Sequence, residues 1–162
     1  MNYDFDEIID RHGTNALKWE VFPEDVLPLW VADMDFAVAP PIINRIKKRL
    51  ENPIFGYSLD NSELIKTIQN RMLERYNWEI DTESIVLVPG IVSGINFTCR
   101  AVCEPGESVI FQTPVYPPFY EAPLNNKLES CLSSLTFDSK AKIYNIDFDE
   151  FTGRIKENTR LF

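Results

Sequence analysis

The second half of the chain alternates between short apolar runs and amphipathic stretches. Apolar runs cover residues 85–88, 108–112 and about 130–137, and they lack the alternation of apolar and polar positions that a strand with one solvated face shows. Helical patterns cover residues 91–103 and about 117–124. Strands that alternate with helices indicate a parallel sheet with helices on both faces. We therefore expect an α/β fold.

Two amphipathic helices are predicted before this region. The first opens at residues 40–41, because proline suits the first turn of a helix. Its apolar face consists of Ile42, Ile46 and Leu50. The second helix follows Asp60, which stands in capping-box spacing to Glu63, and it ends at Asn77.

The ends of the chain are less regular. Residues 1–38 mix aromatic and acidic side chains without a sustained period, which predicts an irregular N-terminal arm. Residues 160–162 have the pattern of another strand, and no linker or repeat marks a boundary there. We therefore expect an arm at 1–38 and an incomplete larger domain at 39–162, whose sheet continues beyond Phe162.

Composition narrows the possible partners. The chain has 44% hydrophobic and 25% charged residues, which is ordinary for a globular protein. A net charge of -9 disfavours nucleic acids and anionic membrane surfaces, because both would repel the chain. The acidic N-terminus lacks the basic start and apolar run of a secretion signal. We expect a cytoplasmic protein with a small-molecule ligand.

The cysteines give no sign of a disulfide or a metal centre. Cys99 and Cys103 lie one helical turn apart, Cys131 is the third, and His12 is the one histidine. A structural zinc site needs about four nitrogen or sulfur ligands. We expect the cysteines to act as small buried hydrophobes and predict no structural metal.

Residues 87–94 contain the most informative turn. The pattern predicts a strand that stops at Pro89–Gly90 and a helix whose first free N–H groups belong to Ile91 and Val92. A helix start of this kind can bind a phosphate group. A strand–proline–glycine–helix turn is also often purely structural, so the residues alone leave both interpretations open.

Four segments together resemble a known family. They cover residues 30–36 (WVADMDF), 55–57 (FGY), 87–94 (LVPGIVSG) and 113–119 (TPVYPPF). In this order and spacing they resemble the pyridoxal-phosphate-dependent carbon–sulfur lyases of the MalY/PatB type. These cystathionine beta-lyases have the class I/II aminotransferase fold (PLP fold type I). Members of the family are more than twice as long, so the resemblance implies an N-terminal arm plus the first half of the large domain.

The resemblance assigns cofactor-binding roles to five residues. Gly90, Ile91 and Val92 would hold the phosphate of pyridoxal 5'-phosphate, and Tyr116 would stack on its ring. Tyr57 would reach the cofactor of a neighbouring subunit, which implies a homodimer. Without the resemblance, the local sequence favours a core aromatic at Tyr116 and a loop residue packed on the surface at Tyr57.

The resemblance also places Ala32 and Asp33 on the substrate side, through backbone groups. Asp33 and Asp35 could otherwise form a catalytic carboxylate pair, although local composition favours turn and capping residues. Ser93 departs from the family pattern, which often has proline there, and should leave the turn intact.

No catalytic residue is expected within these residues. The family's Schiff-base lysine belongs downstream of Phe162, and Lys142, in a superficial Ser-x-x-Lys pattern, is predicted to be a solvated loop residue. The implied reaction is beta-elimination from cystathionine or a cysteine conjugate, which gives a thiol, pyruvate and ammonia. The chain alone is predicted to be inactive. The alternatives are an aminotransferase and a non-catalytic remnant or protein-binding module.

Overall fold

The computed structural model describes residues 3–162. Contacts divide the chain into two compact units, Met1–Asp60 and Asn61–Phe162. Each unit is described by itself.

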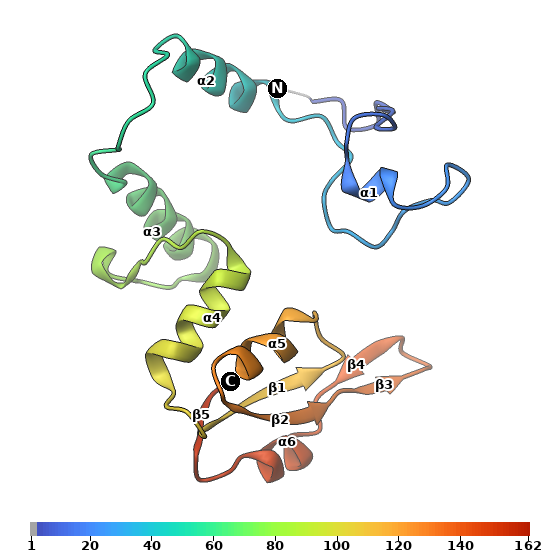
Figure 1. Ribbon diagram of the computed structural model, residues 1–162, viewed down its shortest axis with the longest axis vertical. Helices are drawn as coiled ribbons and strands as arrows, with labels where there is room; N and C mark the ends of the chain where they lie inside the picture. The colour runs from blue at the N-terminus through green and yellow to red at the C-terminus, as the bar shows by residue number, and fades with distance from the viewer. Residues whose placement is uncertain (1–2) are drawn as a thin grey trace. The chain divides into compact units, whose positions relative to one another are not determined.

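The N-terminal unit is largely irregular and holds two helices (Figure 1). These are α1 (Leu17–Glu20) and α2 (Pro40–Leu50). The predicted helix that opens at Pro40 is confirmed, and residues 3–38 hold only the short helix α1. All residues of α2 are exposed, including the basic residues of its last turn, which stabilise the partial negative charge of the helix end.

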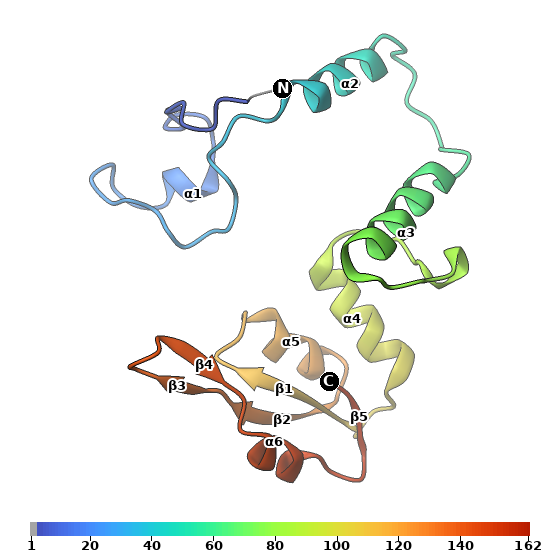
Figure 2. The same ribbon diagram turned by 180° about the vertical axis from the view of Figure 1, so that it is seen from behind.

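The C-terminal unit contains a parallel three-stranded sheet. Its strands β1 (Ser108–Thr113), β2 (Glu129–Ser134) and β5 (Thr159–Leu161) lie in the order β2-β1-β5. Figures 1 and 2 show α5 (Pro118–Asn125) on one face of the sheet and α6 (Phe148–Arg154) on the other. The predicted α/β fold with helices on both faces is therefore confirmed.

This unit also contains elements outside the sheet and its two covering helices. They are the helices α3 (Ser62–Tyr76) and α4 (Ile91–Val102), the 3-10 turn Thr82–Ser84, and the antiparallel hairpin of β3 (Thr136–Asp138) and β4 (Ile143–Asn145). Helix α3 ends as predicted at Asn77, which adopts a left-handed conformation. Its N-cap is Asn61 rather than Asp60, and the Asn61 side chain makes no capping bond.

Two strand predictions are wrong in detail. Residues 85–88 are extended but pair with no strand among residues 3–162, so they form no ladder. The run predicted at 130–137 is divided at Leu135 between β2 and the hairpin strand β3. The pattern shows which residues suit an extended conformation, whereas a strand also needs a backbone partner.

The expectation of strands buried on both faces holds only for β1. Its first four residues are all buried, whereas in β2 the buried residues Cys131 and Ser133 alternate with exposed ones. On the face of α6, the buried Ser133 hydroxyl donates a 2.5 Å hydrogen bond to Glu150 Oε2, which fixes this helix against β2.

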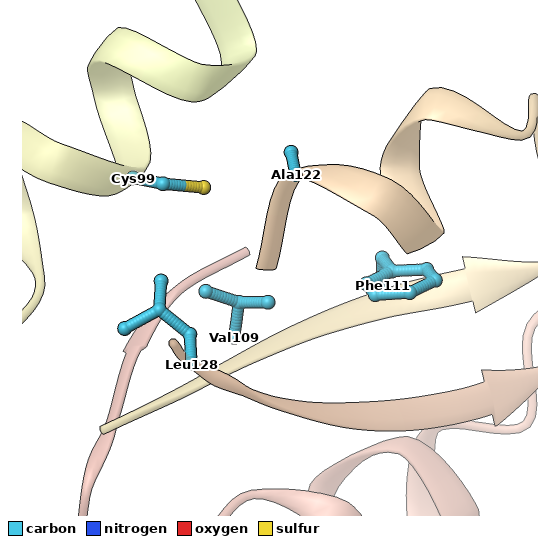
Figure 3. Close-up of a cluster of buried hydrophobic side chains, with 5 residues drawn as sticks. All are labelled: Cys99, Val109, Phe111, Ala122 and Leu128. Carbon is cyan, nitrogen blue, oxygen red and sulfur yellow. The ribbon is translucent and has the colours of Figure 1, made fainter. Parts of the chain in front are cut away.

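The core lies between the sheet and the helices of one face (Figure 3). Cys99 of α4 and Ala122 of α5 form one buried cluster with the sheet residues Val109 and Phe111 (Figure 3). Leu128, which precedes β2, completes the cluster. Cys99 and Cys131 are buried as predicted, Cys103 is half-buried, and all three are free thiols.

Neither a membrane span nor a metal cluster occurs in the described part of the chain. No helix within residues 3–162 is long and apolar enough to cross a bilayer. In the same residues, no group of three or more His, Cys, Asp or Glu side chains could hold a metal ion.

Candidate functional site

The turn before α4 is shaped by Pro89 and Gly90. The Gly90 N–H donates to the Val88 carbonyl over 2.8 Å, which closes a three-residue turn around the proline. Gly90 has φ +104°, a conformation that residues with a Cβ rarely adopt. This glycine therefore sets the direction in which α4 begins.

Three backbone donors at the start of α4 have no partner. The N–H groups of Ile91, Val92 and Ser93 donate to no acceptor within residues 3–162, and the first intrahelical bond is that of Gly94 to the Gly90 carbonyl. No acidic residue stands in the first turn, and no side chain caps it. Free N–H groups and the positive end of a helix dipole attract an anion. The turn thus fits a phosphate group.

A second glycine lets the extended segment pack on α4. A Cβ added at Gly94 would lie 3.2 Å from Cγ2 of Val88, which is tighter than ordinary van der Waals contact. This close approach holds the residue before the turn against the helix that follows it.

An apolar cavity of about 350 Å³ lies beside the turn. Val88 and Ile91 line it on the side of the turn, and Phe119 lines it at the start of α5. The remaining walls come from α4, β1, α5 and the end of the chain: Gly94, Ile95, Thr98, Cys99, Val109, Ile110, Phe111, Pro123, Leu161 and Phe162. Its size lies at the lower end of the range for small-molecule sites.

Tyr116 lies in the loop between β1 and α5. Its side chain is 62% exposed, so the core aromatic that the residues alone suggested is wrong. Its carbonyl accepts a hydrogen bond from the Phe119 N–H over 3.0 Å, which ties the loop to the helix that lines the cavity. The carboxyl end of a parallel strand is a usual place for a ligand, and the Tyr116 ring is accessible there.

The sequence-predicted residues of the N-terminal unit occupy two separate segments. Tyr57 is fully exposed and makes no hydrogen bond, ion pair or ring contact with any of residues 3–162, so the expectation of a tyrosine packed on the surface is wrong. Ala32 is exposed, whereas the neighbouring Asp33 belongs to an ion-pair cluster.

Asp35 is the centre of this cluster. Its carboxylate accepts hydrogen bonds from Lys18 Nζ at 2.6 Å, Arg11 Nη1 at 2.6 Å and Trp19 Nε1 at 2.9 Å. Arg11 also binds Asp33 Oδ2 at 2.8 Å. The Lys18 hydrogen bond, followed by those of Trp19 and Arg11, holds the pKa of Asp35 far below its usual range. The two aspartates are therefore neither a catalytic pair nor simple turn residues, because they bind the arm's cations.

Arg11, Lys18 and Trp19 were not identified as site residues from the sequence. Their aspartate partners lie 15 to 24 positions away, and no periodic pattern connects them. The one sequence signal was the presence of only two cations, Arg11 and Lys18, among nine acidic residues in an arm without helical or strand periodicity.

The same residues can be compared with known proteins. The sequence profile of the family described as aminotransferase class I and II matches residues 24–161. Cystathionine beta-lyase PatB of Bacillus subtilis (strain 168) is 35% identical over 162 residues, which cover 97% of this chain and 41% of PatB. Protein MalY of Escherichia coli (strain K12) is 35% identical over 126 residues, 74% of this chain and 32% of MalY.

A solved structure shows the same fold. The PLP-bound C-S lyase from Staphylococcus hominis superposes with a TM-score of 0.87 at 33% identity. The match covers 98% of this chain and 41% of the lyase chain. The chain thus spans about two fifths of the length of the relatives it matches. With the profile matched over most of its residues, the chain belongs to the aminotransferase class I and II family.

Proposed function

We propose that this chain supplies part of the cofactor and substrate site of a pyridoxal-phosphate-dependent carbon–sulfur lyase. The proposed reaction is beta-elimination from cystathionine or a related cysteine conjugate, which releases a thiol, pyruvate and ammonia. The observation that carries the proposal is the set of free N–H groups at Ile91, Val92 and Ser93 beside the apolar cavity. The relatives named as cystathionine beta-lyases support this choice of reaction.

In this proposal the C-terminal unit holds the cofactor. The amides of Ile91 and Val92 bind its phosphate, Gly90 allows the close approach, and the Tyr116 ring stacks on the pyridine ring. When bound, pyridoxal phosphate supplies an electron sink for the negative charge that develops at the α-carbon of the substrate. The residues of this chain bind and orient, and none of them is assigned the proton transfers.

The N-terminal unit contributes to the substrate side in the same proposal. Ala32 and Asp33 offer backbone groups to the amino-acid substrate, and Tyr57 serves the cofactor of a second subunit in a homodimer. The full exposure of Tyr57 agrees with a residue that needs a partner outside the described chain. A cytoplasmic location stays a prediction.

We expect no turnover by the chain alone, because no lysine in it is assigned to the cofactor aldehyde. Lys142, the one lysine in a suggestive pattern, lies exposed in the β3–β4 turn, as predicted. Pyruvate release from cystathionine by this chain alone would show that the assignment of residues is incomplete.

An aminotransferase is the second candidate. The matching family includes this reaction, and a phosphate site and a stacking ring serve both reactions equally. Product analysis distinguishes them, because a lyase forms pyruvate and a thiol from cystathionine, whereas an aminotransferase forms a keto acid only with an amino-group acceptor.

Cofactor binding can be tested without catalysis. We would titrate the ¹⁵N-labelled chain with 4'-deoxypyridoxine 5'-phosphate, which lacks the aldehyde and cannot react with surface lysines. The same compound without its phosphate is the control. We expect saturable shifts at the Ile91, Val92 and Ser93 amides with the phosphate compound alone. Unchanged amides, or equal shifts with both compounds, would reject the proposed phosphate site.

A further inference from the structure

Lys18 contacts the residues on both sides of the dipeptide Val31–Ala32. Its backbone carbonyl accepts a hydrogen bond from Trp30 Nε1 over 3.3 Å. Its Nζ donates to the carbonyl of Asp33 over 2.9 Å. One residue thus contacts both ends of this short segment, in which Val31 is half-buried and Ala32 is exposed.

The Lys18 side chain is itself well fixed. Lys18 is 8% exposed, and its ammonium group is paired with Asp35 Oδ2 at 2.6 Å in addition to the Asp33 carbonyl. Burial of an ammonium group is tolerated when its hydrogen bonds are made. Arg11 reinforces the arrangement, because its guanidinium binds the carboxylates of both Asp33 and Asp35.

The dipeptide between these anchors keeps its own polar groups free. Val31 and Ala32 take part in no hydrogen bond with any of residues 3–162, and Ala32 is exposed. A backbone segment that is held in place and yet unpaired can bind a polar ligand with little further loss of conformational entropy.

We propose that Lys18 is a positioning residue that holds the Val31–Ala32 backbone ready for a polar group of an amino-acid substrate. This inference rests on the proposed function, which places Ala32 and Asp33 on the substrate side. Lys18 does not touch the substrate in this arrangement, because both of its ends are occupied by Trp30, Asp33 and Asp35.

The test compares variants of the full chain. Lys18→Met keeps the aliphatic stem and removes the ammonium group, and Lys18→Arg restores a cation. Lys47→Met, on the exposed α2, is the matched control. Trp30→Phe removes the hydrogen bond to the Lys18 carbonyl, keeps an aromatic ring beside Phe22 and leaves the Lys18 ammonium group in place, so it separates local loosening from loss of the ion pair.

Two measurements report the outcome. The heteronuclear NOE at the Val31 and Ala32 amides should fall in Lys18→Met, fall partly in Trp30→Phe, and recover in Lys18→Arg. Amide shifts of Ala32 and Asp33 on titration with L-cystathionine should require about tenfold more ligand in Lys18→Met, as expected for the loss of an ordered site. Lys47→Met should match the wild type in both.

Two results would overturn the proposal. One is an unchanged NOE in Lys18→Met, and the other is a wild-type chain whose Ala32 and Asp33 amides do not respond to L-cystathionine. The phosphate-analogue titration at Ile91 and Val92 reports separately on the proposed function, because those residues belong to the other unit. A failure of one proposal can therefore be recognised while the other is supported.

Discussion

The Nζ atom of Lys18 lies 2.6 Å from Oδ2 of Asp35, although the two residues stand 17 positions apart in the sequence. Lys18 is buried, and the Asp35 carboxylate accepts two further hydrogen bonds from Arg11 and Trp19. In a unit that has one long helix and little buried apolar surface, this contact is a main source of order.

The arm should lose its order in acid, and Asp35 should be responsible. Its pKa is depressed in the folded arm, first by Lys18 and then by Trp19 and Arg11. A depressed carboxyl pKa adds stability above the unfolded value of about 3.9, and this stability is lost as the pH falls through the lower folded value. Trp19 and Trp30 fluorescence in a Trp78→Phe background should report this acid transition.

Two variants separate the roles of the aspartates. Asp35→Asn should loosen the arm at neutral pH and remove most of the acid transition. Asp33→Asn should have a smaller effect, because the Asp33 carboxylate has one close cation, Arg11, and lies 4.0 Å from Lys18. Equal behaviour of the two variants would contradict the central role of Asp35.

Gly90→Ala should weaken the phosphate site. The alanine Cβ would meet no atom within 4 Å, so the effect comes from the backbone at φ +104°. We expect a loss of about 1–3 kcal/mol in stability, as for a non-glycine residue forced into an extended conformation with positive φ that is almost restricted to glycine, and weaker binding of 4'-deoxypyridoxine 5'-phosphate.

Gly153→Ala in α6 is the matched control. It also meets no atom within 4 Å, but its φ is not positive. Because alanine favours a helix over glycine by about 1 kcal/mol, this variant should be as stable as the wild type or more stable. Chemical denaturation measures the free energy of unfolding of both variants. An equal loss of stability in Gly90→Ala and Gly153→Ala would argue against backbone strain at Gly90.

The thiols of Cys99 and Cys103 should react slowly with iodoacetamide at neutral pH. Burial raises the pKa of both thiols. The neighbouring Cys103 raises the pKa of Cys99 further, and Glu107 raises the pKa of Cys103 further. Since the thiolate is the reactive form, alkylation should speed up in denaturant. Mass spectrometry should show Cys99 as slower than the half-buried Cys103, and equal rates in native and denatured chain would contradict the burial of Cys99.

The described chain should associate with itself at high concentration. Many large apolar side chains are exposed, among them Val86 and Ile91 at 77% and Leu59 at 98%. Contiguous exposed apolar surface promotes association. Light scattering and dye binding should rise with concentration and fall in Val86→Thr. A monomer with a sharp cooperative melt and no dye binding would contradict this prediction.

Some of the site was predictable because it depends on local sequence. Pro89 and Gly90 end an extended segment and begin a helix wherever they stand in such a pattern, so the free amides of Ile91 and Val92 followed directly. The resemblance assigned Tyr116 a stacking role and its local context suggested burial, and the structure leaves its side chain exposed after β1.

The sequence by itself determined the α/β class, the helices and the turn at Gly90, because hydrophobic periodicity and the conformations of proline and glycine act over a few residues. Only the tertiary structure decided that residues 85–88 form no ladder, that β2 alternates at an edge, and that Lys18 fixes both sides of Val31–Ala32. These features depend on partners far away along the chain, and a linear pattern carries no information about which distant groups meet.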